Sequence, residues 1–227
     1  MGGHGKNRHL KRQNSPLVSG ITRKGPNWVL KPIPGKHSIK HALSLLALLR
    51  DRLGLAENAR QAKKLLINGE VLIDGLKPKK LGIPVGLMDV LSLPKLGKHY
   101  RVVIAKGILT LKEISAEHSK VKYCRINGKT VLRKGKVQLN LHDSRSVLIE
   151  REEDRFKTGD TILVAFAPKQ EIKGFLKMEK GAKCLVFQGK HAGVVGELEE
   201  ILERAGSMPS NARITVGGKS LLTLKDY

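Results

Sequence analysis

The sequence has few aromatic residues, few cysteines and no long apolar run. Phenylalanine, tryptophan and tyrosine together make up 4% of its 227 residues, so sequence reading by extensive base stacking is not expected. The two cysteines lie far apart and offer neither a disulfide framework nor a metal-binding spacing, which fits a reducing cytosol. The longest apolar runs, 45–49 and 162–167, are too short to cross a bilayer, and no signal peptide is visible. We therefore expect a cytoplasmic protein with no membrane partner.

Acidic residues are also scarce, and they are unevenly placed. The first is Asp51, so residues 1–37 contain none. The chain has 43 Lys and Arg residues against 20 Asp and Glu residues, which gives a net charge of +23. Residues 1–97 hold 18 cations against 5 acids, whereas residues 181–227 hold 6 against 5. Such an excess predicts a polyanionic partner, contacted mainly through the N-terminal half.

Glycines, prolines and cations dominate the N-terminal arm, residues 1–37. This composition cannot bury enough apolar surface to fold alone, so we expect residues 1–14 to order only on a partner. A solubility tail or a localisation signal is the alternative. Trp28 is expected to pin the arm to the folded part rather than to stack on a base. The candidate RNA contacts of the arm are Lys6, Arg8, His9, Lys11 and Arg12.

The stretch from Asn58 to Lys80 predicts a helix, a glycine stop, a strand and a tight turn. Asn58 is a good N-cap, and apolar residues follow it at helical spacing. Asn68-Gly69 ends the helix, and Asp74-Gly75 is a hairpin-turn signal. No acid accompanies the cations of the outer helix face, unlike an ordinary solvated helix, which mixes charges. The predicted RNA contacts are Arg60, Lys63 and Lys64 on the helix and Lys77, Lys79 and Lys80 beyond the turn.

The flanking segments predict a further helix and many strands. Residues 38–53 have helical apolar spacing, residues 85–93 indicate a closing strand, and 94–98 a linker. His37 and His41 are four residues apart but have no third ligand at a usual spacing, so no metal site is predicted. Residues 99–180 contain short strand-like runs, with turn signals such as Asn127-Gly128 between some of them. The acidic run 150–154 is interpreted as a solvated loop rather than an acid–base pair.

A glycine-rich turn, residues 189–196, follows a predicted strand at 183–187. Residues 197–205 have some helical periodicity. Gly189, Lys190 and Gly193 are predicted contacts, because glycine lets another backbone or a phosphate come close. We expect this turn to approach a partner through its backbone. The alternative is that the glycines only build the hairpin.

These segments resemble known RNA-binding families. Asn58 to Lys80 resembles the α-L RNA-binding motif, and residues 183–201 resemble the KOW motif, a hairpin of small barrels, which implies a strand at the start of 197–205. The order of segments, with His9-Leu10-Lys11-Arg12, residues 84–90 and the ending 222–227, resembles the e-type small-subunit ribosomal protein four family of archaea and eukaryotes, and the compact length looks archaeal. The resemblance implies an α+β fold with a basic extension (1–37), an α-L domain (38–97), a strand-rich central domain (98–180) and a small KOW-type β-barrel (181–227).

The function that this resemblance implies is structural. The chain is expected to bind and clamp small-subunit ribosomal RNA beside neighbouring ribosomal proteins, with no catalytic residue, cofactor, metal or small-molecule substrate. An RNA-modifying enzyme such as a pseudouridine synthase is one alternative, but its Arg-Leu-Asp context is missing. A KOW transcription-elongation factor is the other, but it would need neither the basic arm nor the α-L motif.

Overall fold

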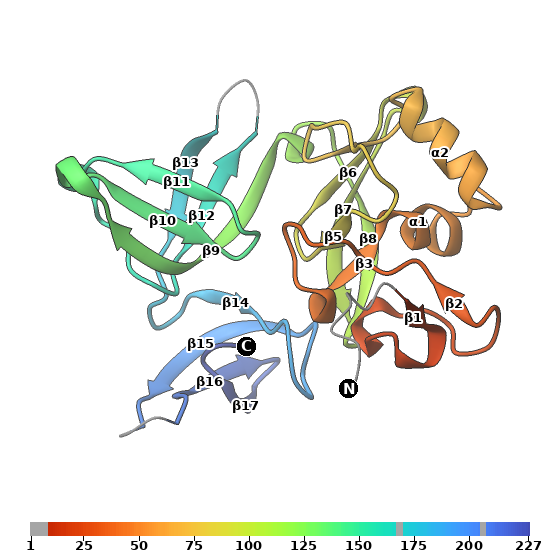
Figure 1. Cartoon of the computed structure of the whole chain (residues 1–227). Coiled ribbons are helices and arrows are strands. Elements are labelled where there is room, and N and C mark those ends of the chain that lie inside the picture. Colours follow the sequence, from red (N-terminus) through yellow and green to blue (C-terminus); the bar gives the residue numbers. More distant parts are fainter. Residues whose placement is uncertain (1–8, 167–169, 205–207) are drawn as a thin grey trace, which may run out of the picture.

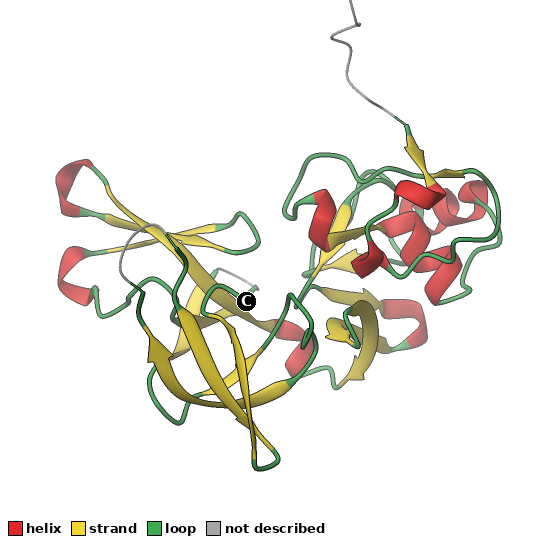
Figure 2. Ribbon diagram, turned by 90° about the horizontal axis from the view of Figure 1, so that it is seen from below, coloured by secondary structure: helices red, strands yellow, loops and turns green. Residues whose placement is uncertain are grey.

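The computed structural model describes residues 9–166, 170–204 and 208–227. Strands predominate over helices, and the chain forms three units, each around its own apolar core (Figure 1). Most of the helical ribbon is gathered in the N-terminal unit (Figure 2). None of the helices in the described ranges is long and apolar enough to span a membrane. The architecture is thus mixed, with few helices and many strands.

The N-terminal unit is built on an antiparallel sheet in the order β4-β6-β7-β8. A second pair, β3 with β5, lies beside it, and helix α2 (Ala59–Ile67) covers part of the core. The strands are β3 (Ala42–Ser44), β4 (Leu72–Ile73), β5 (Pro84–Gly86), β6 (Val90–Leu93), β7 (Lys98–Ala105) and β8 (Ile108–Ile114). Because β6 pairs with β7 throughout its length, the sheet joins strands on both sides of the boundary expected at 97/98.

The predicted helix at 38–53 is only partly correct. A 3₁₀ turn (Ile39–His41) leads into β3, and the helix begins at α1 (Leu45–Ala47) and continues as a π-helical turn (Leu48–Arg52). Ala42 and Ser44 face Gly86 and Pro84 in the β3–β5 ladder, a pairing distant in sequence that overrides the local helical pattern. The residues from Leu45 to Leu49 are all buried, as expected for a helix surrounded by the core.

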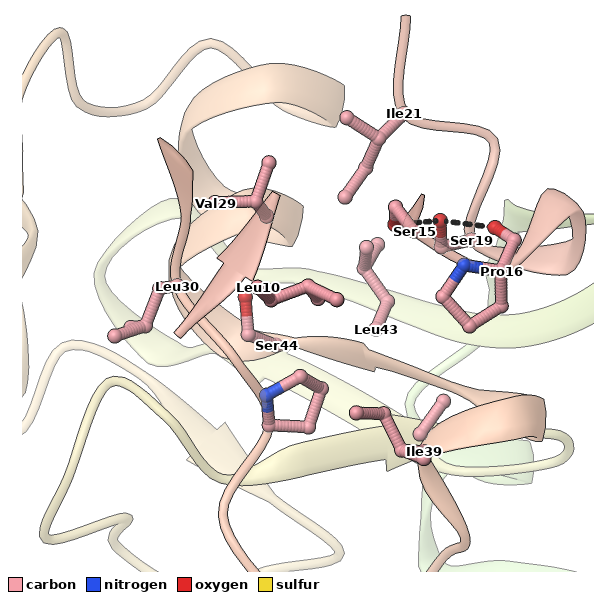
Figure 3. Close-up of a pocket in the computed structure, with 12 residues that line it drawn as sticks. Leu10, Ser15, Pro16, Ser19, Ile21, Val29, Leu30, Ile39, Leu43 and Ser44 are labelled. Atoms are coloured by element: carbon pink, nitrogen blue, oxygen red, sulfur yellow. Dashed lines mark hydrogen bonds between the residues drawn. The ribbon is translucent and has the colours of Figure 1, made fainter. Parts of the chain in front are cut away.

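The arm is folded against this unit from residue 10 onward. Strand β1 (Leu10–Lys11) pairs with β2 (Trp28–Val29), and 3₁₀ turns form at Arg12–Asn14 and Leu17–Ser19. The arm packs on β3 so closely that a void of about 10 Å³ remains (Figure 3), which is too small for anything larger than a water molecule. The order expected only on a partner is therefore present at residues 10–14. Residues 1–8 lie outside the described part.

The central unit is a five-stranded antiparallel sheet in the order β11-β10-β9-β12-β13. Its strands are β9 (Val121–Val131), β10 (Val137–Leu141), β11 (Ser146–Ile149), β12 (Thr161–Ala165) and β13 (Glu171–Leu176). The turn predicted at Asn127-Gly128 is wrong, because β9 runs straight through it. On the neighbouring strand β10 the register shifts, because Asn140 faces Gly128 whereas the next residue, Leu141, faces Ile126. Asn127 is therefore the extra residue of a β-bulge.

The C-terminal unit is a four-stranded antiparallel sheet in the order β14-β15-β16-β17. Its strands are β14 (Lys183–Leu185), β15 (Val195–Leu202), β16 (Asn211–Val216) and β17 (Lys219–Leu224). The strand implied for the first part of 197–205 is present, because residues 197–202 belong to β15. Buried Leu198 alternates with exposed Glu197 and Glu199, so a period of two prevails over the weak helical one.

The remaining described helical segments are short 3₁₀ turns between strands. They lie at Pro94–Leu96, His118–Lys120, Arg133–Gly135 and Arg151–Glu153. The last of these contains part of the acidic run.

Candidate nucleic-acid interface

Helix α2 (Ala59–Ile67) forms where the sequence predicts it. The side-chain oxygen of Asn58 accepts a hydrogen bond from the Gln61 amide at 3.0 Å, and the Gln61 side chain accepts one from the Glu57 amide at 2.7 Å. Ala62 and Leu66 are buried on the inner face. The outer face carries the exposed side chains of Arg60, Lys63 and Lys64.

The chain then returns alongside this helix. Gly69, at a φ of 71°, ends α2, and the Asp74-Gly75 turn has positive φ at both residues, as a type I′ turn requires. Beyond the turn, Lys77 donates from Nζ to the carbonyl of Ile67 at 2.7 Å and so caps the end of α2.

A groove of about 710 Å³ lies between the helix and this returning segment. Its described lining residues include four lysines and no acid. We call it the basic groove; it is lined by Lys63, Leu66, Ile67, Lys77, Pro78, Lys79, Lys80 and Leu81. Four of the six cations predicted in this stretch thus line the groove, and the other two, Arg60 and Lys64, are exposed on α2.

The acids nearest in sequence to the basic groove are engaged elsewhere. Glu70 accepts hydrogen bonds from Lys95 at 2.6 Å and from Asn68 at 3.0 Å, and these bonds hold the pKa of Glu70 below its ordinary value. Asp74 is buried, although its turn borders the groove segment. The groove therefore presents uncompensated positive charge, which suits the phosphates of a nucleic acid.

The predicted contacts of the arm separate into different environments. Lys6 and Arg8 lie outside the described residues. Lys11 is exposed, and the ring of His9 lies 5.2 Å from that of Trp28. Two expectations are corrected here. Trp28 is 56% exposed and does not pin the arm, because Val29, on the opposite face of β2, is the buried residue.

Arg12 is the second correction, because its guanidinium is buried instead of facing a partner. Nε donates to the Pro26 carbonyl at 2.7 Å, and Nη1 donates to the Thr22 carbonyl at 3.0 Å. Arg23 adds bonds from Nη1 to three carbonyls, those of Arg12, Gln13 and Ser15. Arg12 therefore fixes the loop between β1 and β2.

The glycine-rich turn contacts this same chain. Gly193 has a φ of 94°, and a Cβ there would lie 2.8 Å from the carbonyl oxygen of Ile104. The amide of Gly107 donates to the Ala192 carbonyl at 3.1 Å, so the turn docks on the β7–β8 hairpin. The close approach at Gly193 is therefore to another part of this chain, and the predicted contact of this turn with a partner stays a prediction. Gly189 faces the ring of Tyr227 in the same way, and Lys190 is exposed.

A buried group of charges joins the N-terminal and central units, and sequence reasoning missed it. We call it the charge cluster; it comprises Lys36, His37, Asp74, Asp89, Lys122, Asp143 and Arg145. Lys122, which is fully buried, donates to Asp89 at 2.6 Å and to Asp143 at 2.9 Å. The signal that could have revealed Lys122 is its position in β9, where every second residue, 122, 124 and 126, is buried on the inner face.

Mutual attraction keeps Lys122, Asp89 and Asp143 ionised despite their burial. Burial alone would raise the pKa of Asp89, but Lys122 and the hydrogen bond from His37 outweigh it, so this pKa lies below its ordinary value. Burial would also raise the pKa of Asp143, but the attraction of Lys122 outweighs it, so this pKa is lowered too. For Lys122, the attraction of Asp89, Asp74 and Asp143 overcomes desolvation and raises the pKa.

Cys124, His142 and Asp143 have potential ligand atoms within 4.8 Å of one another. Asp143 already binds Lys122 and Arg145, whose positive charges oppose a cation there. Burial raises the pKa of the Cys124 thiol to about 12, so the thiol is protonated at neutral pH in this structure. Of the histidines considered in the sequence, His37 binds Asp89 and His41 packs edge-on against Phe187.

Comparison with known proteins defines the class first. The model of the family described as "Ribosomal family S4e" matches residues 96–172. A protein named "Small ribosomal subunit protein eS4" from Methanothermobacter thermautotrophicus is 43% identical over 222 residues, which cover 97% of this chain and 90% of that protein. The protein of the same name from Methanocaldococcus jannaschii is 42% identical, over 98% of this chain and 93% of its own length. The class is that of archaeal ribosomal proteins.

The solved structure of the 30S ribosomal protein S4e from Thermoplasma acidophilum has a similar fold. It matches with a TM-score of 0.69 and 29% identity, over 82% of this chain and 93% of that chain. The chain belongs to the eS4 family of small ribosomal subunit proteins. Members of this family are cytoplasmic ribosomal proteins with a structural and not an enzymatic role.

Proposed function

We propose that this protein binds and clamps small-subunit ribosomal RNA as a structural constituent of the small subunit, beside neighbouring ribosomal proteins. The observation that carries the proposal is the basic groove, where Lys63 of α2 lies with Lys77, Lys79 and Lys80 and no acid is among the described lining residues. Neutralising phosphates releases counterions, which favours binding to folded RNA by charge and shape.

The proposal also includes the two motifs that the sequence resembles. We assign Asn58 to Lys80 to an α-L motif, supported by the capped helix, the Gly69 stop and the Asp74-Gly75 turn. We assign the C-terminal sheet to a KOW-type unit, supported by the glycine turn between β14 and β15. The three units are joined by direct contacts: the charge cluster, the bond from Gly107 to Ala192, and the bond from Arg125 to the Asp226 carbonyl at 2.8 Å. Such joints let separate contacts act together as a clamp.

The test replaces Arg60, Lys63 and Lys64 together by alanine, which retains helix propensity. Affinity for transcribed archaeal small-subunit ribosomal RNA should fall. The slope of log affinity against log salt should flatten by up to about three charges. The matched control replaces three exposed lysines that lie on strands away from α2, and so makes the same change in net charge. These are Lys112, Lys173 and Lys183.

An unchanged salt slope in a folded triple variant, or an equal loss in the control, would contradict the groove assignment. Co-sedimentation of the full chain with archaeal small subunits tests the wider proposal. Failure of the protein to co-sediment would contradict the ribosomal role itself.

A further inference from the structure

The outer face of the β1–β2 hairpin carries an aromatic group that its own chain leaves open. In the ladder, Leu10 faces Val29 and Lys11 faces Trp28. Because side chains alternate, Leu10 and Val29 turn toward the core, while His9, Lys11 and Trp28 share the outer face. Trp28 is 56% exposed, although a tryptophan ordinarily contributes most of its large surface to packing.

The hairpin is built to hold Trp28 in place. The buried guanidinium of Arg12 and the side chain of Arg23 bond to backbone carbonyls of the loop between the two strands. On the inner face, Val29 is buried against the N-terminal unit (Figure 3). The ring of His9 lies against the indole at an angle of 54° and a centroid distance of 5.2 Å. An exposed aromatic group on such a rigid support loses little entropy when a partner covers it.

The charge around Trp28 indicates the chemistry of that partner. Residues 1–37 contain no acid, and Lys11 stands directly across the ladder. A nucleotide carries a planar base on a negatively charged phosphate backbone, so it matches an indole ring that has an ammonium group beside it. A protein surface would have to be acidic as well as apolar to fit equally well.

We propose that Trp28, with His9 and Lys11, is a stacking site for one unpaired nucleotide of ribosomal RNA. The base stacks on the indole, and Lys11 meets the adjoining phosphate. This inference rests on the proposed function and adds to it a contact that recognises a single-stranded nucleotide, whereas the basic groove attracts phosphates of any folded RNA. The sequence has too few aromatics for extensive stacking, but one fixed ring is enough for one base.

The test uses the fact that Trp28 is the only tryptophan in the chain. The full chain is titrated with a short single-stranded oligoadenylate and with a duplex RNA of equal phosphate number, at equal ionic strength. A base stacked on the indole should quench tryptophan emission in the first titration, while the bound duplex leaves it unchanged. Anisotropy of labelled RNA reports binding independently in both.

The variants are Trp28→Ala, Trp28→Phe and, as a control, Leu17→Ala, which removes another exposed apolar side chain of the arm. Trp28→Ala should weaken oligoadenylate binding about five- to 150-fold, the range expected for one stacked base. Trp28→Phe should retain most of the affinity, and Leu17→Ala should match the unaltered chain. Circular dichroism checks folding, and Trp28→Phe keeps the test valid if Trp28→Ala unfolds the arm.

Unchanged emission when oligoadenylate is bound, or equal affinity of Trp28→Ala and Leu17→Ala, overturns the stacking site. A shift of emission caused by ribosomal proteins, without quenching by RNA, points to a protein partner and also overturns it. In these cases the Arg60, Lys63 and Lys64 variant can still lose affinity for ribosomal RNA, which leaves the proposed function standing. If the unaltered chain binds no RNA at all, both fall together.

Discussion

Replacing Lys122 by methionine would remove the central cation of the charge cluster while keeping a side chain of similar length. Lys122, Asp89 and Asp143 all have fully buried side chains. The variant leaves Asp89 with His37 as its remaining side-chain partner, and Asp143 with Arg145 and the Cys124 thiol. Removing one partner of a buried ion pair costs about 3–5 kcal/mol, because the remaining charge is buried without compensation. We expect a loss of this size in the free energy of unfolding.

The assay is urea unfolding at pH 7, followed by circular dichroism and repeated at lower pH. For a chain of this length, the same loss lowers the melting temperature by about 6–20 °C. The control is Lys120→Met, two residues away, where the lysine is exposed. It makes the same change in charge and should leave stability within about 0.5 kcal/mol of the unaltered protein.

The pH dependence gives the sharper criterion. In the unaltered protein the lowered pKa values of Asp89 and Asp143 stabilise the fold above the ordinary aspartate value of 3.8, and this stability is lost as the pH falls through the folded values. Without Lys122, burial is opposed only by the remaining partners, so we expect the pKa of both carboxyls to be higher than in the unaltered protein. The deficit of Lys122→Met should therefore shrink as the pH falls from 7 toward 4. A deficit below about 1 kcal/mol at pH 7, or one that is constant with pH, would refute this account of the charge cluster.

Three further variants test other joints of the structure. Asn58→Ala removes the cap of α2 and should cost about 1 kcal/mol in urea unfolding, without changing the salt slope of RNA binding; no loss would show that the cap is dispensable. Arg12→Lys keeps the charge but loses the planar fork, so limited proteolysis should cut the arm faster than in Lys11→Gln; equal rates would contradict its positioning role. Gly193→Ala should destabilise the protein by about 1–3 kcal/mol more than Gly181→Ala, a residue of similar positive φ with open space around it, because only the former meets the Ile104 carbonyl. Equal costs would mean that φ alone matters.

Helix α2 could be predicted because its determinants are local. The Asn58 cap, the apolar spacing that buries Ala62 and Leu66, and the Gly69 stop all lie within a dozen residues. The segment 38–53 was predicted less well, because strand β3 depends on pairing with β5, some forty residues later. Leu45–Leu49 is apolar on every side, and such a run does not indicate which of its residues begin the helix.

The charge cluster could not be predicted for the same reason, because its members come from distant parts of the sequence. Asp74 was recognised as a turn former, which it is, but its carboxylate also accepts from Lys36 at 2.7 Å and Arg145 at 2.6 Å. Local pattern cannot reveal that second role, since Arg145 is 71 residues away. Arg12 was misjudged for the same reason, because a cation in a basic arm looks exposed until its carbonyl partners are known.

The basic groove is positively charged more because of where the acids lie than because of the net charge of +23. Of the five acids in residues 1–97, Asp74 and Asp89 are buried in the charge cluster, Glu70 binds Lys95, Asp51 binds Arg50, and Glu57 is exposed just before the cap of α2. Four of these acids therefore serve the protein's own structure, and none of the five is among the described residues that line the basic groove. The same carboxylates that hold the central unit against the N-terminal unit thus leave the outer surface free for phosphates. Folding and RNA binding therefore do not compete for these carboxylates, because Asp74 and Asp89 are paired with cations inside the charge cluster while the cations of α2 stay exposed.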